Sequence, residues 1–248
     1  MKTLRTVIFT LLVLIFALSA NVYAASNNVL RVPVSFNAVK ENPTDAQLAK
    51  NRYDIFIDLE NLLKLKKGIT ISAKIIIPGS IFKSEEDEFK ILPGLEVADQ
   101  KGNYLCGFAS KYEFCLAKEG NAPVLAKQFI NRNKFRGAGI YGSVKKSGSK
   151  YYVVELKNLP LLDLSVSDGK TKLSKMIAGG KKYQLGVSVI IQGAFSKKVS
   201  GQSVYVDDVK LTASKIQSVN FSKASAYRAL HASKGSKDIG VKVAKLTY

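Results

Sequence analysis

The chain contains no tryptophan, two cysteines and one histidine among 248 residues. With His231 as the sole imidazole, Ser-His-Asp hydrolysis would depend on one residue, and no histidine pair can hold a metal. The absence of tryptophan removes the largest aromatic surface for stacking sugar rings, so tyrosine is left for that role. Two cysteines are an even number, which in an exported protein favours one disulfide bond.

The N-terminus has the features of a secretory signal peptide. Lys2 and Arg5 precede an apolar run over residues 7–18, and Val22-Tyr23-Ala24 provides small residues at the cleavage positions. This pattern predicts a signal peptide over residues 1–24 and a periplasmic or extracellular protein, with an uncleaved anchor as the alternative. No later apolar segment is long enough to span a membrane as a helix.

Basic residues are concentrated in the second half of the chain. Residues 25–120 hold 13 Lys or Arg and 13 Asp or Glu, whereas residues 121–198 hold 15 against three and residues 199–248 hold eight against three. Such a distribution predicts a face that attracts an acidic polysaccharide, an anionic envelope polymer or, peripherally, lipid headgroups. No specific nucleic-acid partner is expected. The alternative is that the scattered lysines serve only solubility.

Short alternating segments separated by Gly, Asn and Ser turns indicate an all-β protein. Eight or more such strands with few helical patterns favour a jelly-roll β-sandwich over residues 25–213. The expected strands are residues 30–36, 53–59, 68–77, 94–98, 139–144, 151–156, 183–192 and 204–211, with a brief helix from Pro43 to Lys50.

A basic extension is expected to follow over residues 214–248. Ser222 to Ser233 has a capping serine and apolar residues at helical spacing, which predicts a helix. Ile239 to Tyr248 alternates as a last strand does. The fold class predicted is therefore a jelly-roll β-sandwich with a short C-terminal α/β extension.

Cys106 and Cys115 lie in a segment, residues 104–116, that predicts a hairpin with its tip near residues 109–111. A disulfide between them would join the two strands. A loop of this length would stabilise the fold by about 2 to 3 kcal/mol.

Two adjacent carboxylates, Asp207 and Asp208, lie in the alternating strand Ser203 to Leu211. Strict alternation places one of them on the same face as the apolar residues, and a buried carboxylate needs a cation or donors. The strand resembles the last strand of carbohydrate-binding modules with a galactose-binding-like jelly roll, and Lys67 to Pro78 resembles another strand of that family. The resemblance implies a structural calcium at Asp207 or Asp208. The acidic segment near the mature N-terminus that supplies further ligands in that family is not recognisable here, and Glu41 and Asp45 are the candidates for that role. The alternative is neutralisation by Lys210 or a nearby arginine.

The same resemblance implies a glycan ligand. The tyrosines that lie on expected strands or their turns are Tyr104, Tyr112, Tyr141, Tyr151 and Tyr152. For an anionic ligand, Arg132, Lys134 and Arg136 alternate and would share one face of an extended segment, and Lys145, Lys146 and Lys150 follow.

The sequence therefore predicts an exported, non-catalytic protein that binds a glycan or an anionic envelope polymer. A polysaccharide hydrolase using a pair of carboxylates is an alternative, and Asp54, Asp58 and Glu60 lie near an expected strand. The Ser147 and Lys150 pair has the Ser-x-x-Lys spacing of some acyl-transfer enzymes, which chance explains in a chain this rich in both residues. A structural or adhesion component of the envelope is the third possibility.

Overall fold

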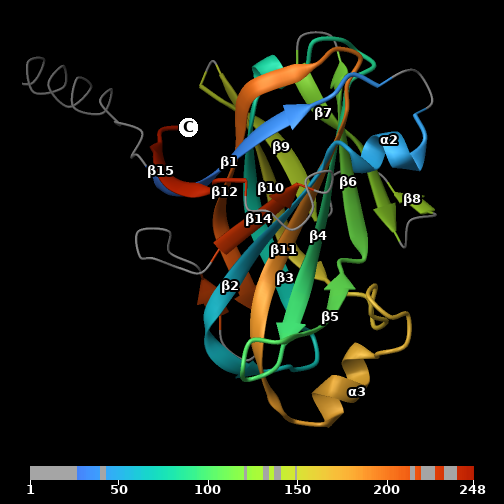
Figure 1. Ribbon diagram of the computed structural model, residues 1–248, viewed down its shortest axis with the longest axis vertical. Coiled ribbons are helices and arrows are strands. Elements are labelled where there is room, and N and C mark those ends of the chain that lie inside the picture. The colour runs from blue at the N-terminus through green and yellow to red at the C-terminus, as the bar shows by residue number, and fades with distance from the viewer. Residues whose placement is uncertain are drawn as a thin grey trace, which may run out of the picture.

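The computed structural model describes residues 27–39, 43–119, 122–130, 134–136, 141–148, 150–212, 216–218, 227–231 and 239–248. In this part of the chain, two antiparallel β-sheets form a sandwich with two short helices, α2 (Asp45–Ala49) and α3 (Leu173–Ala178) (Figure 1). The seven-stranded sheet runs β15 (Lys242–Leu246), β1 (Asn27–Phe36), β12 (Val199–Thr212), β3 (Thr70–Pro78), β10 (Tyr151–Pro160) and β9 (Gly142–Ser147), with β13 (Ile216–Ser218) paired to β12.

The eight-stranded sheet runs β14 (Tyr227–His231), β2 (Arg52–Lys64), β11 (Lys182–Ala194), β4 (Glu88–Ala98), β6 (Tyr112–Glu119), β7 (Ala122–Ile130) and β8 (Lys134–Arg136), with β5 (Tyr104–Ala109) paired to β4. Along the chain, successive pairs of antiparallel strands lie alternately in the two sheets. The seven-stranded sheet contains β1/β12 and β3/β10, and the eight-stranded sheet contains β2/β11 and β4/β6. This order is that of a jelly roll, and the predicted all-β sandwich is confirmed.

The core lies between the sheets and follows from the period-two alternation of the strands. On β2, Tyr53, Ile55, Ile57 and Leu59 are buried, while the residues between them are half-buried. Each such aliphatic side chain contributes about 1.5 to 3 kcal/mol when fully buried. The inward-facing apolar side chains of the two sheets pack against one another and form one main core cluster.

A second, smaller apolar cluster covers the outer face of the seven-stranded sheet. Ile75 and Ile77 belong to the main core, but Ile76 between them points the opposite way and packs with Val29, Val153 and Leu246. The rings of Tyr151, Tyr205 and Tyr248 pack against this outer cluster. The unbroken isoleucine run of β3 is thus explained by apolar contacts on both faces.

The segment after residue 213 adds edge strands to both sheets. Residues Tyr227–His231 form β14 on the edge of β2, so the helix expected over Ser222 to Ser233 is wrong at these positions. Backbone groups on the edge of β2 offer a ladder of hydrogen bonds, whereas a short isolated helix is marginal. The rest of that expected helix lies outside the described residues. The expected last strand is present as β15, which pairs with β1.

The cysteines are not bonded to each other, and both are buried. Cys106 lies opposite Val97 and Cys115 opposite Lys90, both along β4. These positions on one strand are about 23 Å apart, whereas a disulfide needs Cα atoms within about 7 Å. The chain continues along β4 from β5 to β6 instead of turning back, so the predicted hairpin and disulfide are wrong.

The predicted signal peptide falls on residues that the structure does not describe. Within the described residues, no helix has the length and hydrophobicity needed to cross a membrane.

Candidate functional site

The two adjacent carboxylates of β12 lie at a β-bulge. The register with β3 shifts between Asp207 and Lys210, and Asp208 adopts a φ of 53°. Asparagine and aspartate are the residues that most readily take this left-handed conformation. The bulge reverses the phase of the alternation, because Val206 before it and Val209 after it are both buried. Both carboxylates are half-buried, and the expectation that one of them faces the interior is wrong.

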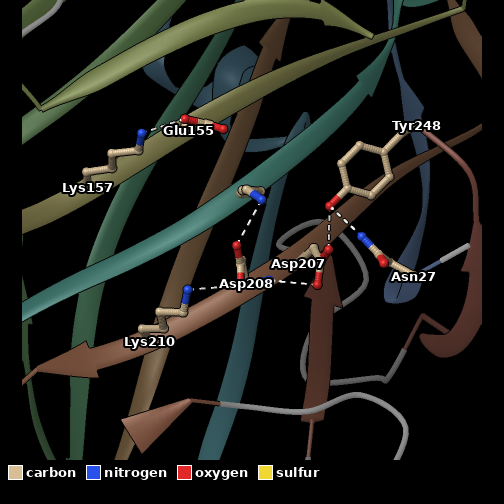
Figure 2. Close-up of polar contacts among 8 residues, drawn as sticks. Asn27, Glu155, Lys157, Asp207, Asp208, Lys210 and Tyr248 are labelled. Atoms are coloured by element: carbon tan, nitrogen blue, oxygen red, sulfur yellow. Dashed lines mark hydrogen bonds and ion pairs between the residues drawn. The ribbon is translucent and has the colours of Figure 1, made fainter. Parts of the chain in front are cut away.

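Asp208 is neutralised by two lysines. Its Oδ2 lies 2.9 Å from Lys74 Nζ. Its Oδ1 lies 3.0 Å from Lys210 Nζ (Figure 2). The hydrogen bond from Lys74 is the largest cause of the lowered pKa of Asp208, and the same bond raises the pKa of Lys74. Both groups are therefore charged at neutral pH.

Asp207 is held by donors rather than by a cation. The Tyr248 hydroxyl donates to its Oδ2, and the backbone N–H of Asp208 donates to its Oδ1 at 2.7 Å. Asn27 Nδ2 donates to the same tyrosine oxygen at 3.4 Å (Figure 2). Burial, followed by the hydrogen bond to Asp207, raises the pKa of Tyr248 to about 12.

These carboxylates do not fit a calcium site. Calcium takes six to eight oxygen ligands, whereas ammonium groups, a hydroxyl and a backbone N–H occupy the oxygens of Asp207 and Asp208. Nowhere in the described ranges do three His, Cys, Asp or Glu residues gather closely enough to hold a metal. Asp45 lies in the first turn of α2, and Glu41 is outside the described residues. The alternative to calcium was neutralisation by Lys210, and Lys210 does pair with Asp208. Lys74, on the neighbouring strand β3, is a second cation at the same carboxylate.

The five tyrosines predicted as ligand-binding residues do not form one platform. Tyr112 is buried and stacks against Tyr141 with ring centroids 4.4 Å apart. Tyr104 lies at the start of β5 and is 52% exposed. Tyr151 and Tyr152 begin β10 in the other sheet. Tyr151 and Tyr152 together line one cavity with four basic side chains.

That cavity, which we call the rim pocket, has a volume of about 640 Å³ and lies where the chain leaves β3. Four cationic side chains line it, and no Asp or Glu of the described chain does. Its lining residues are Arg31, Pro78, Gly79, Ser80, Phe82, Lys118, Lys146, Lys150, Tyr151, Tyr152, Gly201, Gln202, Ser203 and Tyr205.

Neighbouring strands fix the geometry of one wall of the rim pocket. Arg31 lies opposite Tyr205 on β12, and its Nε donates to Ser203 Oγ at 2.9 Å. The rings of Tyr151 and Tyr205 meet edge to face with centroids 6.0 Å apart. Burial, followed by the proximity of Tyr151, raises the pKa of Tyr205, so its hydroxyl remains protonated at neutral pH.

The turn after β3 closes the other side of the rim pocket. Gly79 donates its N–H to the carbonyl of Lys150 at 2.9 Å. A Cβ on Gly79 would lie 2.8 Å from the ring of Tyr152, so only glycine allows this close approach without movement of the ring. The turn after β3 is thereby joined to the start of β10, which places Lys150 at the rim pocket.

The rim pocket has the chemistry of an anion-binding site. A guanidinium and three ammonium groups provide charged donors, and the hydroxyls of Tyr151 and Tyr205 can donate as well. The tyrosine rings and Phe82 provide apolar surface next to these donors. The volume lies within the range of about 300 to 1,000 Å³ that is usual for small-molecule sites.

The predicted basic cluster is only partly brought to this pocket. Lys146 and Lys150 line it, and Lys145 is exposed on β9. Lys134 and Arg136 lie on the short strand β8, which was not among the expected strands, and their side chains are not described. Arg132 lies outside the described residues.

Arg31 and Lys118 are functional candidates that sequence reasoning missed. Both come from the half of the chain whose charges balance, and they lie on different sheets. Only the pairing of β1 with β12 and the position of β6 bring them to the pocket. No local pattern in the sequence indicates this.

The carboxylates considered for hydrolysis lie on β2, in the other sheet. Asp54 forms an ion pair with Arg52, whose Nε is 2.7 Å from Asp54 Oδ1. Asp58 lies opposite Gly186 on β11. The side chain of Glu60 is not described.

Comparisons of the chain with protein-family models, with curated proteins and with solved structures found no match. The function is therefore argued from the geometry of the site.

Proposed function

We propose that this protein is a non-catalytic binding protein that recognises an acidic glycan or a related anionic polymer through the rim pocket. One observation carries the proposal: four cationic side chains converge on one cavity that no described carboxylate lines. The chain has 19 Asp and Glu residues, but no described one lines the rim pocket, so the charge of its lining is entirely positive. The positive potential of such a cavity raises the local concentration of anions.

Arg31 and the tyrosines favour an acidic glycan over a simple inorganic ion. A guanidinium whose Nε donates to Ser203 has two further nitrogens that can donate in parallel to a carboxylate or sulfate. A small inorganic ion would make no apolar contact with Tyr151 and Phe82, whereas the CH face of a sugar ring can pack against them. A uronic-acid or sulfated polymer supplies both features.

Export follows from the predicted signal peptide and is part of the same proposal. The protein would meet its polymer in the periplasm or outside the cell. Basic residues elsewhere on the second half of the chain would add nonspecific attraction.

The test compares two polymers with one backbone: polygalacturonate and its methyl-esterified, uncharged form. Affinity electrophoresis of the mature chain is expected to show retardation by polygalacturonate only. The double variant Arg31→Gln/Lys150→Gln is expected to lower this retardation about tenfold. Equal retardation by both polymers would contradict an anionic ligand, and release of reducing ends would favour the hydrolase alternative.

A matched control removes the same charge elsewhere. Lys66 and Lys67 are exposed in the turn before β3, whereas the rim pocket lies at the end of that strand. The separation along β3 is about 26 Å. The variant Lys66→Gln/Lys67→Gln is expected to retain most of the wild-type retardation.

A further inference from the structure

The end of the sandwich that carries α3 exposes an apolar patch. In the part of the chain that the structure describes, five large apolar residues are exposed: Leu62, Tyr104, Leu105, Leu164 and Val166. Single exposed apolar residues are common on folded proteins, but a group of them marks a surface that meets a partner. The strand register and the course of the chain place all five at this one end.

The register of the eight-stranded sheet relates Leu62 to Tyr104. Leu62 on β2 lies opposite Gln184 on β11, and Gln184 lies opposite Ala98 on β4. Ala98 in turn lies opposite Tyr104 at the start of β5. The two apolar residues therefore stand in one row of the sheet, three strand spacings or about 14 Å apart. Leu105 is the next residue of β5.

The segment that follows β10 lies along β5 and adds Leu164 and Val166 to the patch. Leu162 donates its backbone N–H to the carbonyl of Ala109 at 2.9 Å, and Val166 donates to the carbonyl of Gly107 at 2.9 Å. Helix α3 comes next in the chain, and Figure 1 shows it below β5 at the lower end of the sandwich. The patch therefore includes residues from β2, β5 and the segment before α3.

The same end of the molecule is rich in lysine. We call the three stretches that form it, residues 64–69, 98–105 and 161–182, the basic tip. They contain nine lysines and three aspartates, with no Arg or Glu. Lys64 lies opposite Lys182, two residues beyond the row of Leu62. All nine lysines are exposed: Lys64, Lys66, Lys67, Lys101, Lys170, Lys172, Lys175, Lys181 and Lys182.

The three aspartates have structural roles within the basic tip. Each accepts a backbone N–H group of its own stretch: Asp99 from Lys101 at 2.8 Å, Asp163 from Ser174 at 2.6 Å and Asp168 from Thr171 at 3.0 Å. These hydrogen bonds fix the shape of the loops. The excess of nine lysines over three aspartates makes the potential around the apolar patch positive.

We propose that the basic tip binds the surface of an anionic phospholipid membrane. The ammonium groups contact the headgroup phosphates, and the exposed apolar side chains enter the boundary between headgroups and acyl chains. Lysine suits this position, because its apolar stem lies along the interface while its charge stays in water. A soluble acidic polymer would contact the lysines and leave the apolar residues in water, whereas a membrane contacts both.

This site is independent of the rim pocket. The rim pocket lies where the chain leaves β3, and the basic tip includes the turn that precedes β3. The two are about 26 Å apart along that strand. Contact of the basic tip with a membrane therefore leaves the rim pocket accessible to its polymer.

Cosedimentation of the full mature chain with vesicles tests the proposal. Vesicles of phosphatidylglycerol and phosphatidylcholine in equal parts are compared with vesicles of phosphatidylcholine alone. Wild type is expected to bind the anionic vesicles at least about tenfold more tightly. Lys170→Gln/Lys172→Gln is expected to weaken this binding about tenfold. The rim variant Arg31→Gln/Lys150→Gln removes the same charge and is expected to lose less than about twofold.

Two further variants test the apolar contact separately from the charge. Leu105→Thr/Val166→Thr leaves the net charge unchanged and is expected to weaken binding to anionic vesicles about tenfold, because less apolar area is removed from water. Leu105→Trp provides the chain with its only tryptophan. Its emission is expected to shift to the blue when anionic vesicles are added. A cooperative thermal transition establishes that each variant is folded.

Equal binding to both kinds of vesicle, or binding to neither, would overturn the proposal. An unchanged emission maximum of Leu105→Trp would also overturn it, since the lysines would then attract the chain to the surface without apolar contact. Sedimentation velocity without vesicles tests a second copy as the occupant. A dimer that Leu105→Thr/Val166→Thr dissociates would assign the patch to self-association and contradict the membrane site.

Discussion

The Tyr248 hydroxyl donates a hydrogen bond to Asp207, across the width of β1. Tyr248 follows β15, Asp207 lies on β12, and β1 runs between these two strands. The tyrosine ring also packs on the outer apolar cluster with Val29 and Ile76. One residue therefore satisfies a carboxylate and covers apolar surface at the same time.

Replacement of Tyr248 by phenylalanine keeps the ring and removes the hydroxyl. We expect the free energy of unfolding to fall by about 1 to 2 kcal/mol, because a half-buried carboxylate loses a donor. Urea denaturation measures the change. Tyr104→Phe is the control, since that hydroxyl bonds to Ser167 on an exposed surface. Equal stability of Tyr248→Phe and wild type would show that the contact contributes nothing.

The bulge at Asp208 predicts a difference between two substitutions at the same position. Asp208→Asn keeps a side chain that tolerates a φ of 53° and loses only solvent-screened ion pairs, which cost under about 1 kcal/mol. Asp208→Val adds backbone strain of about 1 to 3 kcal/mol. The free energies of unfolding of the two variants, obtained from thermal denaturation, should differ by that amount. If both variants melted together, the left-handed conformation would not be a constraint.

Asp87 predicts a loss of stability in acid. Although it lies in an acidic stretch of the sequence, it is 1% exposed and accepts the N–H groups of Lys83, Ser84 and Ser196 at 2.6, 2.9 and 2.8 Å. Burial alone would raise its pKa, but these hydrogen bonds outweigh burial and lower it. A lowered pKa contributes stability above the unfolded value of about 3.9, which is lost as the pH falls through the folded value.

We expect Asp87→Asn to lower the free energy of unfolding by about 2 to 4 kcal/mol at pH 7 and by less near pH 3. Glu85→Gln, at an exposed neighbour, should change neither value appreciably. Urea denaturation at the two pH values measures both. A cost for Asp87→Asn that did not shrink in acid would contradict the role of its charge.

The two cysteines are expected to be reduced thiols that react only after unfolding. Burial raises the pKa of Cys106 to about 11, so little thiolate is present at neutral pH. Alkylation in denaturant without a reductant should label both residues, and the midpoint of unfolding should not depend on reductant. Failure to label either residue until a reductant is added would show a disulfide.

The fold class was predictable because alternation and turn residues are local properties. Tyr53 to Leu59 alternates in the sequence and is buried in alternation. Strands β10, β11 and β12 were recognisable from their β-branched and apolar residues between turns, although each contains consecutive buried residues. The C-terminal segment was harder, since Tyr227 to His231 is helical by local pattern and forms a strand through pairing with β2. Edge pairing is a tertiary interaction that no window of sequence contains.

The candidate site was predictable only in part for the same reason. Tyr151, Tyr152, Lys146 and Lys150 are close in sequence and remain close in the rim pocket. Arg31 reaches the pocket only through the register of β1 with β12. The bulge reversed the expectation for the carboxylates, because a change of one residue in register moves a side chain to the other face. The expected hairpin was wrong because β5 and β6 pair with successive parts of β4.

Calorimetric titration of oligogalacturonate into the mature chain tests the central claim most directly. Wild type, Arg31→Gln/Lys150→Gln and Lys66→Gln/Lys67→Gln are compared at salt concentrations of about 50 mM and about 500 mM. Anion binding in the rim pocket predicts that only the first double variant loses about tenfold or more in affinity at low salt. Equal losses in both double variants would mean that the oligomer responds to net charge alone, which would contradict a binding site at the rim pocket.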